Sequence, residues 1–102
     1  MIPEPLRNQL SEDPFYKKCC ITGHKNERIE FHHNLIFAGK QVNRKFCILP
    51  LLQSVHRNIV KYREKCDWIM WNRATREERE EFSKAINIDY RLGYLNEKYG
   101  EY

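Results

Sequence analysis

The spacing of apolar residues changes once along this chain, and that change constrains the fold more than any other feature. Residues 28–33 alternate between apolar and polar side chains, as expected of a half-buried strand. From residue 55 onward, apolar residues recur every three or four positions, which is the spacing of one helix face. This stripe consists of Val55, Ile59, Tyr62, Cys66, Ile69 and Met70. The sequence therefore predicts an α+β fold in which short strands precede a helix running to about Trp71.

Two short antiparallel strands are expected before that helix. Gly23 and the polar residues after it predict a tight turn that leads into a first strand at Arg28–His33. The second strand is the apolar run 46–49, and Pro50 should end it because proline cannot donate to a ladder. We expect a basic loop over residues 34–45 to join the two strands.

The helix boundaries are predicted from capping residues. Ser54 is the expected N-cap of the long helix, which places His56 in its first turn. Thr75–Glu78 has the form of a capping box, so a second helix should begin there and end near Ala85 or Ile86, with Phe82 and Ile86 facing inward. A third helix is expected from Asp89 to about Tyr99, ending at Gly100.

The chain is short enough to form a single domain of three parts. Residues 1–18 hold three of the four prolines and are expected to form an extended arm, with at most a short helical turn around residues 6–10. Residues 19–72 form the core, and residues 73–102 form a helical extension that covers it. A homodimer contact through these last helices is the alternative to a covering role.

Charge and cysteine content narrow the classes of function. No apolar run approaches the roughly 20 residues that a membrane span needs, and the first residues do not resemble a secretory signal, so we expect no membrane partner and a cytoplasmic location. In that compartment the four cysteines should be thiols or metal ligands. Residues 19–66 carry nine bases and three acids, a net charge of +6. Nucleic acid is therefore the first partner to consider, and a solvated basic surface is the alternative.

One stretch of residues, 30–34, carries the candidate chemistry. It reads Glu30-Phe31-His32-His33-Asn34, and a further histidine, His56, follows in the predicted helix. Hydrolysis of a phosphodiester needs a divalent metal to neutralise developing charge and a neutral histidine to accept a proton from water. Strand alternation places His32 on one face with Glu30 and His33 on the other, unless the strand twists at its end.

These residues resemble the HNH endonuclease family. The matching segments are the strand end at 30–33, the loop through Gly39 with Asn43-Arg44, and residues 48–56 entering a helix. The opening Cys19-Cys20-Ile21-Thr22-Gly23 is similar to that of small HNH-like nucleases encoded by bacteriophages. The resemblance covers roughly residues 19–62. It implies a ββα-metal core, built from a short hairpin and a helix, and hydrolysis of DNA.

Carried over by position, the resemblance assigns a role to each polar residue. It implies that His32 and His56 are metal ligands and that His33 is the general base. Asn43 stands near the family's middle asparagine but lies thirteen residues before His56, where Cys47 has the usual spacing; Asn34 is a substitute. Glu30 becomes a bracing acid. The DNA phosphates would contact Lys40, Arg44, Lys45 and Arg57.

The sequence also departs from the family pattern. Val60 stands where some members carry a further helix histidine, which leaves two protein ligands and favours Mg²⁺ or Mn²⁺, with Zn²⁺ and Ni²⁺ as alternatives. The cysteine pairs of the family's zinc knuckles are incomplete. An irregular zinc site remains an option, drawn from Cys19, Cys20, His24, Cys47 and Cys66.

Three functions therefore remain open. The first is a metal-dependent DNA endonuclease. The second is a non-catalytic nucleic-acid-binding module on a degenerate HNH scaffold, and the third is a structural zinc domain.

Overall fold

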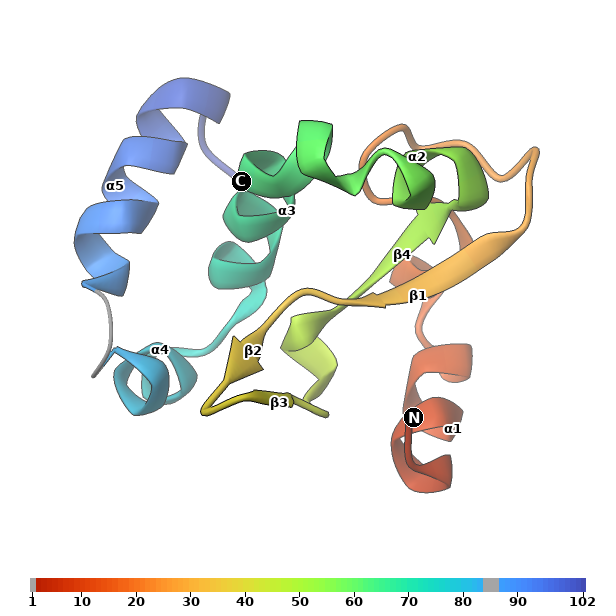
Figure 1. Cartoon of the computed structure of the whole chain (residues 1–102), viewed down its shortest axis with the longest axis horizontal. Helices are drawn as coiled ribbons and strands as arrows, with labels where there is room; N and C mark the ends of the chain where they lie inside the picture. Colours follow the sequence, from red (N-terminus) through yellow and green to blue (C-terminus); the bar gives the residue numbers. More distant parts are fainter. Residues whose placement is uncertain (1, 84–86) are drawn as a thin grey trace.

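The computed structural model has a two-stranded sheet beside a long central helix, with shorter helices around them (Figure 1). The structure describes residues 2–83 and 87–102. The elements in chain order are α1 (Glu4–Glu12), η1 (Pro14–Lys17), β1 (Ile29–His33), β2 (Ile36–Phe37), β3 (Lys40–Gln41), η2 (Lys45–Cys47), β4 (Ile48–Leu52), α2 (Gln53–Arg57), α3 (Ile59–Arg73), α4 (Arg76–Phe82) and α5 (Ile88–Tyr99). The predicted α+β class is confirmed.

Strands β1 and β4 form the antiparallel pair expected from the sequence, but β4 covers residues 48–52 instead of 46–49, and Phe46 and Cys47 lie in the 3₁₀ helix η2. Pro50 lies in the middle of this buried strand, opposite Phe31, so the expectation that it ends the strand is wrong. Its carbonyl accepts a hydrogen bond from Cys20 N at 2.9 Å. Because N–H and C=O of one residue point the same way in an antiparallel strand, the missing donor of Pro50 faces away from β1 and removes no bond to it.

The basic loop between these strands contains a small hairpin of its own. Strand β2 pairs with β3, with Ile36 opposite Gln41 and Phe37 opposite Lys40. Ala38 and Gly39 form its turn and both have positive φ, 53° and 77°. Positive φ is readily adopted by Gly39, which has no Cβ. The hairpin projects from the end of β1 (Figure 1).

The single helix expected from Ser54 to Trp71 is two helices. Helix α2 follows β4 without a loop, and Asn58, with φ −109° and ψ 32°, separates it from α3. Leu52 occupies the N-cap, so the assignment of Ser54 as the cap is wrong. The capping acceptor comes instead from Glu27, whose carboxylate accepts from Ser54 N at 3.0 Å and Ser54 Oγ at 2.8 Å.

The N-terminal segment is helical, and the prediction of an extended arm is wrong. Pro3 is the N-cap of α1 and Pro5 lies in its first turn, where backbone N–H groups have no intrahelical acceptor. The segment packs Leu10 and Tyr16 against Ile48 of β4. The Tyr16 hydroxyl lies 2.7 Å from the Lys45 carbonyl and 2.9 Å from the Ile48 carbonyl, so it can donate to either.

Two further helices cover the other side of α3. The capping box is confirmed, since Glu78 N donates to Thr75 Oγ1 at 3.1 Å and Thr75 N donates to Glu78 Oε1 at 2.8 Å. Helix α4 ends at the buried Phe82; Ala85 and Ile86 lie outside the described residues. The predicted third helix is confirmed as α5, with Gly100 as its C-cap.

Helix α3 lies between two buried clusters. Cys66 and Ile69 pack with Leu49 and Leu51 of β4. Met70 and Trp71 pack with a second group that includes Phe46, Ala74, Phe82 and Ile88. This arrangement holds the open face of α3 beside the end of β1, where the candidate residues lie.

Candidate functional site

His32 and His56 come together although they belong to different elements. The centroids of their rings are 5.1 Å apart and the ring planes are inclined by 65°. Residues two apart in a strand share a face, so Glu30 accompanies His32 on this face of β1. Glu30 Oε1 lies 2.9 Å from His56 Nδ1. A carboxylate on one imidazole nitrogen fixes the ring and leaves the other nitrogen, here Nε2, free.

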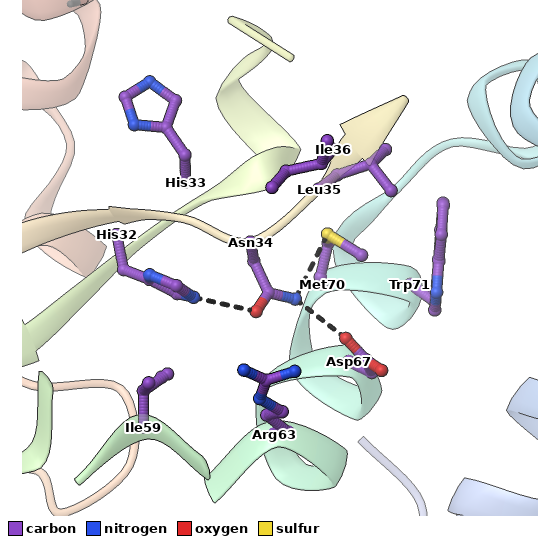
Figure 2. A pocket seen from close by; sticks show the side chains of 10 residues that line it. All are labelled: His32, His33, Asn34, Leu35, Ile36, Ile59, Arg63, Asp67, Met70 and Trp71. Carbon is purple, nitrogen blue, oxygen red and sulfur yellow. Dashed lines mark hydrogen bonds between the residues drawn. The ribbon is translucent and has the colours of Figure 1, made fainter. Parts of the chain in front are cut away.

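Asn34 connects His32 to α3 (Figure 2). Its Nδ2 donates to Asp67 Oδ1 at 3.0 Å and to Met70 Sδ at 3.4 Å, while its Oδ1 lies 3.1 Å from His32 Nε2. Because Asn34 Oδ1 can only accept, His32 Nε2 carries the hydrogen and Nδ1 has the free lone pair. Asp67 is held in turn by Arg91 of α5, with 3.5 Å between Oδ2 and Nη2.

Burial sets the protonation of this chain of residues. Burial lowers the pKa of His32 below its usual value, and the charge of the neighbouring His56 adds to the effect. Burial raises the pKa of Asp67, although hydrogen bonding to Asn34 and the charge of Arg91 partly oppose the change. His32 is therefore favoured in its neutral form, which a metal ligand requires.

His33 lies on the opposite face of β1 from His32 (Figure 2). It is the last residue of the strand, and its Nε2 lies 2.8 Å from Asn43 Oδ1. As the amide oxygen accepts, His33 Nε2 donates and Nδ1 is left as the basic nitrogen. The structure thus pairs His33 with Asn43 and His32 with His56, and it does not bring the two pairs together on one face.

A cavity of about 370 Å³ runs along α3 beside His32. Both His32 and His33 border it. Its polar side also contains Asn34, Arg63 and Asp67, and most of its apolar side is formed by Leu35, Ile36 of β2 and the end of α3. Arg63, Asp67 and Arg91 were not among the site residues predicted from the sequence. The sequence does contain a signal for Asp67. It is an acid beside the apolar stripe of α3 and follows Arg63 by four residues, so the two side chains share one helix face.

The four predicted phosphate-binding residues have different surroundings. Arg44 pairs with Glu81 and Lys45 with Asp13, each at 2.8 Å. Lys40 lies on β3 and Arg57 at the end of α2; both are exposed and form no ion pair with the residues described. Lys40 and Arg57 are thus free to meet an anion, whereas Arg44 and Lys45 must first give up an acidic partner.

The cysteines do not assemble the irregular zinc site considered from the sequence. All four are free, and Cys47 lies in a different buried cluster from Cys19 and Cys66, while His24 is exposed. Burial raises the pKa of Cys66 to about 12, which favours the thiol form. Within residues 2–83 and 87–102, no three His, Cys, Asp or Glu side chains are placed to hold a metal.

Comparisons of the chain with protein-family models, with curated proteins and with solved structures find no match. No helix in the described part of the chain is long and apolar enough to cross a membrane.

Proposed function

We propose that this protein is a divalent-cation-dependent DNA endonuclease with a ββα-metal core formed by β1, β4 and the helix that begins with α2. The observation that carries the proposal is the meeting of His32 and His56 at 5.1 Å between ring centroids, with Glu30 on His56 Nδ1. An acid that orients one imidazole beside a second, neutral imidazole is typical of a metal site.

The side chains present fit a cation with two protein ligands. His56 offers Nε2 and His32 offers Nδ1, and no third side chain from the described residues joins them. Water and phosphate oxygens would complete the coordination, as Mg²⁺ and Mn²⁺ commonly accept. When bound, the cation would neutralise the charge that develops on the phosphate and the leaving oxygen.

His33 is the proposed general base. Its Nδ1 would accept the proton of the attacking water, while Asn43 holds the ring through Nε2. His33 is the final residue of β1. A phosphate just beyond the strand end would therefore lie near His32 on one face of the strand and near His33 on the other. Lys40 and Arg57 would bind neighbouring phosphates. Exposed ion pairs contribute only about 0–1 kcal/mol, so Arg44 can exchange the carboxylate of Glu81 for a phosphate at small cost, whereas Lys45 pairs with the half-buried Asp13.

Cleavage of supercoiled plasmid tests the proposal. The protein is incubated with Mg²⁺, Mn²⁺, Ni²⁺ or Zn²⁺, and nicked and linear products are separated on a gel. His33→Ala should abolish cleavage, whereas His24→Ala, which removes an exposed histidine outside the site, should not. Absence of cleavage with every cation, or equal cleavage by His33→Ala, would refute the proposed reaction.

A second candidate function is a non-catalytic DNA-binding module. It is favoured by the position of His33 and His32 on opposite faces of β1 and by the two-histidine ligand set. This function predicts DNA binding that weakens with salt and survives both His32→Ala and His33→Ala. The same plasmid would then bind without being cut.

A further inference from the structure

We propose that the cavity along α3 is a subsite for one unpaired nucleotide of a DNA strand, with Arg63 binding its phosphate and the apolar wall around Ile36 contacting its base. The proposal rests on the proposed endonuclease function and specifies its substrate class. It predicts faster action on DNA with unpaired nucleotides beside the cleaved bond than on a continuous duplex.

Arg63 provides the polar end of the subsite. Its guanidinium points toward Asn34, and Asp67 lies one turn farther along the same helix, α3 (Figure 2). Asp67 is already bound to Asn34 and Arg91, and Arg63 forms no ion pair with any residue that the structure describes. A guanidinium with unused donors in a cavity beside His32 suits a phosphate, because its planar fork matches two phosphate oxygens.

The apolar end lies beyond Asp67, where α3 faces β2. Leu35, Ile36, Met70 and Trp71 line it. Trp71 and Met70 are buried, whereas Ile36 is 67% exposed and is therefore the apolar residue of this wall that a ligand would cover. The flat face of a nucleobase would cover Ile36 and remove apolar surface from water.

The order of these groups matches the order of groups in a nucleotide. Along α3 the cavity passes from Ile59 and Arg63 to Met70 and Trp71, so its cationic part is next to His32 and its apolar part is farther away. A phosphate on Arg63 would therefore adjoin the phosphate proposed to lie at His32. The cavity volume of about 370 Å³ falls within the range of roughly 300–1,000 Å³ found for small-ligand sites.

The apolar wall selects for an unpaired base. In a duplex both faces of each base are stacked and its edge is paired, so a base reaches a recessed wall only when it is unstacked. Asp67 supplies a carboxylate between the two ends, which disfavours a second phosphate there and can accept from a base amino group. The cavity thus has one place for an anion and one for an aromatic ring.

The test is an NMR titration of the full-length ¹⁵N-labelled protein in chelator, without divalent cation. The probes are a single-stranded tetranucleotide, a duplex containing the same four bases, and thymidine monophosphate. The tetranucleotide should shift the resonances of Ile36, Arg63 and the Trp71 indole. The indole of Trp68, which is bonded to Asn96 on α5, should not move and is an internal control.

Matched variants identify the two ends of the subsite. Arg63→Ala should weaken binding of the tetranucleotide by about ten- to a hundredfold, since it removes a charge-assisted contact. Ile36→Ser should weaken it by about fivefold. Arg7→Ala removes an exposed arginine of α1, and Val60→Ser removes an exposed apolar residue outside the cavity; neither should change binding.

Three outcomes overturn the subsite. They are no shifts at the cavity with the tetranucleotide, shifts with the duplex equal to those with the tetranucleotide, or shifts with thymidine monophosphate but none with the tetranucleotide. Because no cation is present, this result is independent of cleavage. A protein that cuts plasmid without these shifts refutes the subsite and retains the endonuclease. A protein that shows the shifts but never cuts retains the nucleotide site and refutes the reaction.

Discussion

Replacement of Asn34 by alanine should destabilise the fold as well as the site. The side chain makes a hydrogen bond with His32 and donates to the carboxylate of Asp67 at 3.0 Å. A neutral hydrogen bond contributes about 1 kcal/mol net and one to a charged group about 1.5–3 kcal/mol. Asn34 is half-buried, so we expect the free energy of unfolding to fall by about 2–3 kcal/mol.

Urea unfolding followed by circular dichroism measures this loss. With an m-value of about 1.5 kcal/mol/M, the midpoint should fall by about 1.3–2 M. Asn43→Ala is the matched control, because the side chain of that exposed asparagine bonds, among the described residues, only to His33; its loss should cost less than about 1 kcal/mol. If Asn34→Ala costs no more than Asn43→Ala, the bridge from β1 to α3 does not carry the stability assigned to it.

Three further predictions follow from contacts around the site. Tyr16→Phe removes the hydroxyl between the Lys45 and Ile48 carbonyls and should lower the free energy of unfolding by about 1–2 kcal/mol, seen as a drop in Tm of several degrees; an unchanged Tm would contradict it. The raised pKa of Asp67 stabilises the fold below its ordinary value of 3.8, and this contribution is lost as the pH rises through the folded-state pKa. The stability of wild type relative to Asp67→Asn should therefore decrease with rising pH in urea titrations, and an increase would contradict the assignment. Glu30→Gln should weaken Mn²⁺ binding by about tenfold in calorimetry if the carboxylate orients His56, whereas equal affinity would exclude that role.

Local signals in the sequence predicted the local parts of the fold. The Thr75 capping box and the helix stop at Gly100 depend on residues within a few positions, and both are confirmed. The predictions at the prolines failed because the effect of a proline depends on its position within a helix or sheet. Pro5 is compatible with the first turn of a helix, and Pro50 with the free side of a two-stranded sheet, and neither context is visible before the elements are placed.

Strand alternation predicted which side chains of β1 share a face. The contacts of the site that join residues far apart in the chain were not predictable. Alternation placed Glu30 with His32 and separated His33, as the structure has them. The cap of α2 comes from Glu27, and the partner of Asn34 is Asp67, which is 33 residues away in the chain. Such pairings depend on how α3 packs on the sheet, and no spacing rule within one element contains that information.

The break at Asn58 determines where the chain tolerates a change of length. Helix α2 continues directly from β4, so the pairing of β4 with β1 fixes where His56 lies relative to His32 and Glu30. One residue inserted between Leu52 and His56 would turn the imidazole by about 100° around the helix axis and away from Glu30. An insertion at Asn58 comes after α2. It would alter α3 and the cavity while leaving His32, Glu30 and His56 in contact.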